Sequence, residues 1–130
     1  MEITHINPES MHSSPAFSQG VLVSGPHSTL YVGGQNGRNA DGSVVEGGLG
    51  PQTVRALENV LAVLAEAGAD QTNVVSMTIT LAGGADANEG FAASAEVWGR
   101  HATAVQVNQV DGLADPEFLV EVSAVAVIPA

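Results

Sequence analysis

The sequence predicts an α+β domain in which a mixed sheet carries two helices on one face. Five short segments have the apolar alternation or the apolar run that is typical of a strand, and two segments have apolar residues at helical spacing. These segments follow one another as strand-strand-helix-strand-helix-strand-strand. Because 130 residues is the usual length of one domain, we expect a single domain over residues 1–130.

The first two strands are expected at residues 17–23 and 30–32, where apolar and polar residues alternate. The Gly25-Pro26 pair between them is a turn signal, so the two strands are predicted to form a hairpin. Residues 33–50 are rich in glycine and have no periodic apolar pattern, which indicates a long loop. Loops of this length in a small domain are usually functional or mobile, so this loop is a candidate pocket wall.

The first helix is expected at residues 51–67. Pro51 suits the first turn of a helix, because its missing amide hydrogen would have no helical partner there, and Gly68 is a natural stop. Apolar residues recur every three or four positions between them, which predicts one helix face buried against the sheet. This stripe comprises Val54, Leu57, Leu61 and Leu64.

The remaining elements are a strand at 74–81, a second helix at 87–99, and strands at 104–107 and 118–128. The first of these strands alternates apolar and polar residues, and the helix has its apolar residues at helical spacing. The last strand is rich in valine and nearly apolar, as a central buried strand would be.

The chain is strongly acidic. Fourteen carboxylates stand against three arginines and no lysine, which gives a net charge of −11. This charge repels a phosphate backbone, so we expect no nucleic-acid partner. Only 13% of the residues are charged whereas 45% are hydrophobic, which leaves few surface charges to keep a monomer in solution. Burial of surface between subunits is therefore expected.

Three absences narrow the function further. The chain has no cysteine, which excludes disulfides and thiolate chemistry. No apolar run approaches the roughly 20 residues that a membrane span needs, so we expect no membrane partner. The acidic start at Met1-Glu2 has no signal-peptide pattern, which favours the cytoplasm.

Metal and phosphate sites lack their usual motifs. The four histidines lie far apart and form no i, i+4 pair, so we expect no metal site. A phosphate-binding loop would need a lysine to meet the charge, and the chain has none. The glycines before Pro51 are therefore interpreted as a flexible entry into the helix. We expect no cofactor.

Glu121 stands out among the carboxylates because it interrupts the apolar last strand. A buried carboxylate must be paired, hydrogen-bonded or protonated, so Glu121 lies either at a solvated edge or in a site. Arg100 also has two interpretations, a cation favoured by the helix dipole or a site residue. A serine hydrolase is not expected, because no G-x-S-x-G motif is present and Ser18 has no base beside it in the sequence.

Five fragments stand in an order and spacing that are hard to obtain by chance: 15–21 (PAFSQGV), 30–35 (LYVGGQ), 52–69, 103–107 (TAVQV) and 120–127 (VEVSAVAV). Together they resemble the reactive intermediate deaminase family, also called the Rid or YjgF-like family. The resemblance implies a chorismate-mutase-like α+β fold. It also implies a homotrimer with a small-molecule pocket in each cleft between subunits.

The resemblance further implies two functional groups in the deaminating branch of the family. An arginine there binds the carboxylate of a 2-imino or 2-enamino acid, and a glutamate positions the water that hydrolyses the imine. Glu121 matches the glutamate. The arginine has no match, because Ala102 stands at its position with Arg100 two residues before it. Phe17 and Gly33 stand where that branch has a tyrosine and a serine.

These departures lead to two hypotheses. The first is a Rid-like homotrimer that hydrolyses or tautomerises an imine, enamine or carbonyl compound but is not a typical 2-aminoacrylate deaminase. The alternative is a non-catalytic metabolite-binding or regulatory protein that uses the same cleft. The ribonuclease activity ascribed to some relatives is disfavoured by the charge of −11.

The first hypothesis assigns a role to each candidate site residue. Glu121 is the catalytic base or the group that orients water. The glycines and a glutamine supply backbone and amide contacts, and an aromatic ring packs on the ligand. The residues expected to bind the substrate are Phe17, Gly33, Gly34, Gln35, Arg100 and Thr103.

Overall fold

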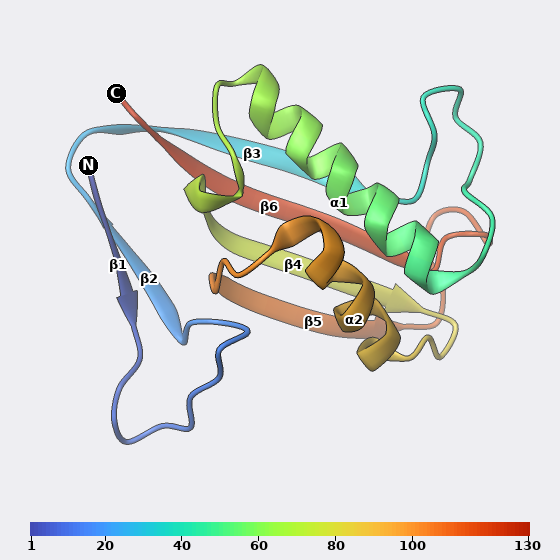
Figure 1. The fold of residues 1–130 in the computed structure, drawn as a ribbon, viewed down its shortest axis with the longest axis horizontal. Coiled ribbons are helices and arrows are strands. Elements are labelled where there is room, and N and C mark those ends of the chain that lie inside the picture. Colours follow the sequence, from blue (N-terminus) through green and yellow to red (C-terminus); the bar gives the residue numbers. More distant parts are fainter.

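Six strands and two α-helices make up the chain in the computed structural model, which describes residues Met1–Ala130. Both helices cover one face of a four-stranded sheet (Figure 1). This arrangement confirms the expected α+β class. In chain order the elements are β1 (Glu2–Ile6), β2 (Gly20–Ser24), β3 (His27–Gln35), α1 (Leu49–Glu66), the short 3₁₀ turn η1 (Gln71–Asn73), β4 (Val74–Ala82), α2 (Ala87–Trp98), β5 (Ala104–Val110) and β6 (Val120–Pro129).

The main sheet is mixed and has the strand order β3-β6-β4-β5. Strands β4 and β5 are parallel, because α2 carries the chain back between them, and the other pairs are antiparallel. Strand β6 therefore lies in the interior of the sheet, as its nearly apolar sequence predicts. Neither helix has the length and hydrophobicity that crossing a bilayer requires.

The core lies between the sheet and the helices. Alternate residues of β6 face the helices and are buried, among them Val120 and Val122. From α1, Val60 and Leu64 pack into the same cluster with no exposed surface. This packing follows from the period of two in the strand and the spacing of three to four in the helix.

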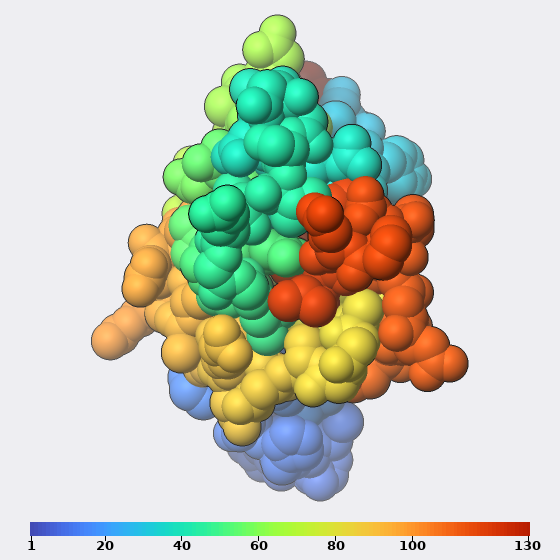
Figure 2. All heavy atoms as spheres, turned by 90° about the vertical axis from the view of Figure 1, so that its right-hand side faces the viewer, coloured from blue at the N-terminus to red at the C-terminus, as the bar shows by residue number.

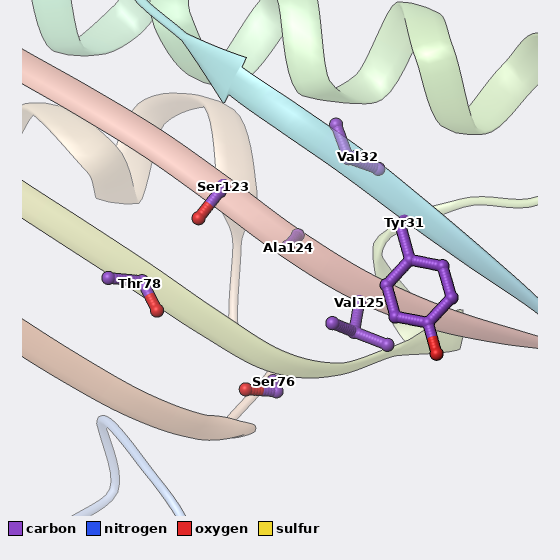
Figure 3. A pocket seen from close by; sticks show the side chains of 7 residues that line it. All are labelled: Tyr31, Val32, Ser76, Thr78, Ser123, Ala124 and Val125. Atoms are coloured by element: carbon purple, nitrogen blue, oxygen red, sulfur yellow. The ribbon is translucent and has the colours of Figure 1, made fainter.

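The opposite face of the sheet carries no helix (Figure 1). Tyr31 on this open face is 76% exposed. A shallow hollow of about 200 Å³ lies beside it. Besides Tyr31 it is lined by Val32, Ala124 and Val125 and by three residues with hydroxyl groups, Ser76, Thr78 and Ser123 (Figure 3). A row of hydroxyl groups therefore lies on the open face, and Glu121 is two residues from Ser123 on the same side of β6.

The predicted hairpin between the first two strands is wrong. Strand β2 pairs with β1, with Glu2 opposite Ser24, while β3 pairs with β6. Gly25 has a φ of 85°, and the Pro26 that follows has no amide hydrogen to donate, so the chain changes direction here without closing a hairpin. Strand β1 was not predicted from the sequence, because its residues form no apolar face. Most of them are exposed in the structure.

Several element ends also differ from the prediction. Strand β3 continues to Gln35, so Gly33 and Gly34 lie in a strand and the glycine-rich loop begins later. Helix α1 begins at Leu49, which still leaves Pro51 in the first turn. Strand β5 reaches Val110, because its parallel pairing with β4 stabilises residues that have no regular apolar pattern.

Candidate functional site

Glu121 lies near the start of β6, half-buried, on the open face of the sheet. Its backbone is opposite Thr80 of β4, and Thr80 is in turn opposite Asn108 of β5, so the three side chains form one row across the sheet. Because β6 is an interior strand, Glu121 does not lie at a sheet edge. Its role in a site stays a prediction.

Gly34 of β3 allows the Glu121 side chain to lie flat against the neighbouring strand. A Cβ atom at position 34 would be 2.7 Å from Glu121 Cδ and 3.0 Å from its Oε1, closer than van der Waals contact allows. The pairing of β3 with β6 is irregular between Val32 and Gln35, which brings this glycine next to the carboxylate. Gly34 therefore fixes where the carboxylate can lie.

The amide of Asn36 is the hydrogen-bond partner of Glu121. Asn36 Nδ2 donates to Glu121 Oε1 at 3.4 Å. A tight turn follows, in which Arg38 N donates to Asn36 O at 2.8 Å. Helix α1 holds this turn, since Asn59 Nδ2 donates to both Asn36 O and Arg38 O at 3.1 Å. Neither asparagine was among the predicted site residues, and the only signal for Asn36 was its place directly after the strand that carries the glycines.

Gln35 and Gly33 lie beside this group. Gln35 Nε2 donates to Gly33 O at 3.1 Å, so the amide is turned onto its own strand. Gly33 is exposed, and a Cβ atom there would meet no atom within 4 Å. The backbone at Gly33 is therefore open to a ligand that approaches the open face.

Phe17, Ser18 and Thr103 form a second group at the other end of the sheet. Ser18 N donates to Thr103 O at 2.9 Å, which attaches the loop before β2 to the start of β5. The Thr103 side chain is 1% exposed and its hydroxyl donates to Val74 O at 3.0 Å. Phe17 is half-buried in the same loop, and its ring meets His12 edge-on at 5.9 Å. This group thus presents the Phe17 ring on a firmly attached loop.

Two histidines that are distant in the sequence also meet at this end. The rings of His5 and His101 lie 5.9 Å apart, and His5 Nδ1 is 2.8 Å from Ser18 Oγ. Ser18 Oγ donates to Ala102 O at 2.6 Å, so its proton is directed at a carbonyl group and His5 acts as the donor to the serine. Ser18 is also only 4% exposed. It is therefore a structural residue and not an activated nucleophile.

The two groups are separate within one chain. The Phe17 loop pairs with Ala104, which is opposite Ser76, whereas Glu121 is opposite Thr80. Four residues along a strand correspond to about 13 Å. Arg100 lies farther still from Glu121, exposed just beyond the Gly99 that ends α2. One chain consequently brings Gly33, Gly34 and Gln35 to Glu121, but not Phe17, Arg100 or Thr103.

The charges near the site are sparse. The chain has one ion pair, between Arg55 and Glu58 on α1 at 3.3 Å, so neither Arg38 nor Arg100 is paired with a carboxylate. In the glycine-rich loop, hydrogen bonds from the Ser43 hydroxyl and amide lower the pKa of Asp41. No three side chains of the types that bind metals come together. The site therefore offers a carboxylate, amides and open backbone groups.

The connection before β6 lies at the same end of the molecule as the glycine-rich loop. It lies against the glycine-rich loop in Figure 2, where residues near 115 and residues near 40 are in contact. Gln52 of α1 holds it with both ends of its buried amide, since Nε2 donates to Glu117 O and Oε1 accepts from Leu119 N, each at 2.9 Å. Arg38 lies over the ring of Phe118, with 5.0 Å between its Cζ and the ring centroid.

Comparison with known families gives a match over almost the whole chain. Residues 8–128 match the model of the family described as endoribonuclease L-PSP. Among solved structures, the Rid-family protein YyfB from Yersinia pestis, whose function is unknown, is 35% identical with a TM-score of 0.84, and the match covers 97% of this chain and 98% of that one. The Rid-family protein YyfA from the same organism is 26% identical with a TM-score of 0.69, covering 96% and 98%.

Curated relatives match over a shorter stretch. The 2-iminobutanoate/2-iminopropanoate deaminase of Rattus norvegicus is 44% identical over 68 residues, which is 52% of this chain and 47% of the relative. The deaminase of the same name from Homo sapiens is 42% identical over 67 residues, 51% and 47% of the two chains. The matched part thus spans about half the length of these relatives.

Proposed function

Because the chain belongs to the endoribonuclease L-PSP family, which includes the Rid (YjgF-like) proteins, we propose that it forms a homotrimer with a small-molecule pocket in each cleft between subunits. In each cleft the Glu121 group of one subunit faces the Phe17 and Thr103 group of its neighbour. The separation of the two groups within one chain, about 13 Å or more along the strands, supports a site shared between copies. The exposed open face supports it as well.

The observation that carries the functional proposal is the state of the Glu121 carboxylate. A carboxylate can accept about four hydrogen bonds, and this one accepts a single long bond, from Asn36. No cation is paired with it. A half-buried carboxylate with free acceptor positions on the open face is suited to take a proton from water or from a substrate.

We assign to this site the hydrolysis or tautomerisation of an imine or enamine. In hydrolysis, Glu121 accepts a proton from water as the water oxygen bonds to the imine carbon. The electron pair of the C=N bond moves to the nitrogen of the protonated imine, which gives a carbinolamine. Glu121 passes its proton to this nitrogen, the C–N bond breaks as the hydroxyl group loses its proton to Glu121, and the products are a carbonyl compound and ammonia. Water is the only co-reactant, so the reaction needs neither metal nor cofactor.

The other residues bind the substrate in this proposal. Gly33 and Gly34 allow the ligand to approach the backbone of β3, with Gln35 beside them. The neighbour's Phe17 packs on the ligand, held in place by the hydrogen bond between Ser18 N and Thr103 O. Arg100 of the neighbour lies at the rim of the cleft.

The substrate is proposed to differ from 2-aminoacrylate. An arginine that binds a carboxylate in a desolvated cleft contributes about 2–5 kcal/mol, and Ala102 cannot replace it. The mammalian relatives are named as deaminases of 2-imino acids, and this chain is similar to them over about half of their length. We therefore expect only weak activity on the imines formed from serine or threonine. The same Ala102 favours the second candidate function, a non-catalytic metabolite-binding protein.

The test is the Glu121→Gln variant, which keeps the shape of the side chain and removes its charge. Ammonia release from a panel of imines should fall about 100-fold or more, while the oligomer mass stays that of the wild type. Glu117→Gln is the matched control, because Glu117 lies four residues away and is exposed. Unchanged turnover in an intact Glu121→Gln oligomer would remove Glu121 from the chemistry and favour the binding protein.

A further inference from the structure

The Glu121 carboxylate has only uncharged groups around it. Its one hydrogen bond comes from Asn36 Nδ2 at 3.4 Å, and it forms no ion pair. Across the sheet, Thr80 of β4 and Asn108 of β5 follow it in one row, and both are neutral. Ser123, two residues along β6, adds a hydroxyl group on the same face (Figure 3). The half-buried negative charge therefore has no positive partner within the chain.

None of the three arginines supplies such a partner. Arg55 is engaged in the ion pair on α1. The guanidinium of Arg38 lies over the ring of Phe118, which is itself buried. Arg100 is exposed just beyond the end of α2. In the proposed assembly the neighbour's Arg100 lies at the rim of the cleft, where water and salt screen its charge.

The carboxylate is accessible to a small ligand from the open face. It lies against Gly34, where a Cβ atom would be 2.7 Å from Glu121 Cδ, so β3 contributes no side chain at this point. Gly33 beside it is exposed. The two oxygens of a carboxylate have about four acceptor positions, and Asn36 uses one of them. The remaining positions are open to N–H donors of a ligand.

Electrostatics favours a positive ligand over a negative one at this position. Removing an unpaired carboxylate from water is costly, and a cation that donates hydrogen bonds to it offsets this cost. A carboxylate on the ligand would instead place a second negative charge beside Glu121. The net charge of −11 acts in the same direction, because it attracts cations and repels anions.

We propose that the ligand at the Glu121 site is a cation, namely the protonated imine of a simple amine that carries no carboxylate. Its N–H groups donate to Glu121, and its positive charge is the feature that the site recognises. This inference rests on the proposed ligand site at Glu121 and adds the charge of the ligand. The ring of the neighbour's Phe17 in the proposed cleft offers the cation an aromatic face.

The test is a titration of the wild-type protein with three molecules of one shape, followed by the NMR shifts of the Gly33 and Gly34 amides. Propanamidinium is positive and is a stable analogue of a protonated imine, propanamide is neutral, and propanoate is negative. Sodium chloride keeps the ionic strength equal in the three titrations. The wild type should bind the amidinium about tenfold or more tightly than the amide, and propanoate more weakly than either.

Glu121→Gln keeps the shape of the side chain and removes its charge. This variant should bind the amidinium no more tightly than the amide, with unchanged affinity for the amide. Glu117→Gln is the matched control, because it removes the same charge from an exposed residue four positions away. It should keep the preference of the wild type, which separates binding at Glu121 from the general attraction of an acidic protein for cations.

Three results would overturn the proposal: equal binding or no binding of all three molecules by the wild type, tightest binding of propanoate, or a Glu121→Gln variant that keeps the preference for the amidinium. The outcome is independent of catalysis. A preference that depends on Glu121 in a protein that hydrolyses no imine would keep the charge of the ligand and remove the hydrolytic function. Hydrolysis of imines without such a preference would do the opposite.

Discussion

Gly34→Ala should change the position of the Glu121 carboxylate, which we propose to be catalytic, without a substitution at Glu121 itself. The new methyl group would lie 2.7 Å from Glu121 Cδ, 3.0 Å from Cγ and 3.0 Å from Oε1. Gly34 does not have a positive φ, so its backbone accepts alanine. The atoms in the way belong to the end of a flexible side chain, which will move while the strands stay in place.

The size of the effect follows from these distances. An ordinary carbon contact begins near 3.4 Å, so Cδ must retreat by at least about 0.7 Å from the 2.7 Å it would have. A displacement of about 1 Å at a reacting group can lower the rate about 100-fold. The free energy of unfolding should change by less than about 1 kcal/mol, because the loss of backbone freedom in the unfolded chain offsets the cost of a strained rotamer.

The assay is ammonia release from imines, with a thermal melt of each variant. We expect Gly34→Ala to lose 10- to 100-fold in turnover with a melting temperature close to that of the wild type. Gly112→Ala is the control, because a Cβ atom there meets nothing within 4 Å and the residue lies in the connection before β6. Full activity of a folded Gly34→Ala protein would refute the argument that this glycine sets the position of the carboxylate.

Three further predictions concern stability and assembly. Gln52→Leu leaves Glu117 O and Leu119 N without the hydrogen-bond partner that the buried Gln52 amide provides, so the free energy of unfolding in urea should fall by about 1–3 kcal/mol. An unchanged midpoint of urea unfolding would contradict this. Hydrogen bonds from Thr72 lower the pKa of Asp70 below its ordinary 3.8, which stabilises the fold above that pH and loses its effect as the pH falls through the lowered pKa. Thr72→Val should therefore melt below the wild type at neutral pH, with a gap that closes below pH 3.8; a gap independent of pH would exclude the hydrogen bond as its cause. Tyr31→Asp puts a charge on the open face, so light scattering should show a trimer for the wild type and smaller species for the variant, and a wild-type monomer would refute the assembly.

Much of the fold could be predicted because local patterns and tertiary packing agree. The stripe of α1 and the apolar run of β6 each predict a buried face. Leu57 and Leu64 of the stripe are buried and Val122 of β6 is buried in the same core cluster, whereas Val54 and Leu61 of the stripe are only half-buried. The pairing of β2 could not be predicted in this way. Its partner β1 has no apolar face, and the turn signal at Gly25-Pro26 does not distinguish a hairpin from a change of direction.

The candidate site could be predicted only where one of its residues departs from a regular sequence pattern. Glu121 interrupts an apolar strand, and Gly34 marks a close approach of side chain to backbone. Asn36 and Asn59 break no pattern, because asparagine is common in loops and on exposed helix faces. Their role depends on contacts between residues 23 positions apart, and between residues 85 positions apart, which only the folded chain reveals.

The cleft that we propose between subunits can be tested by mixing two variants that should each be inactive. Glu121→Gln removes the carboxylate from one side of each cleft, and Phe17→Ala removes the ring from the other. If equal amounts of the two variants are unfolded together and refolded, the subunits should assemble at random. About a quarter of the clefts should then have both sides intact. A blend of the two folded homotrimers, without unfolding, is the control.

The decisive measurement is therefore the turnover of the refolded mixture, per cleft, on the best imine of the panel. A site shared between subunits predicts that the mixture regains about a quarter of the wild-type activity while the unmixed blend stays inactive. A refolded mixture with no more activity than the two homotrimers would show that the groups of Glu121 and Phe17 do not act in one cleft.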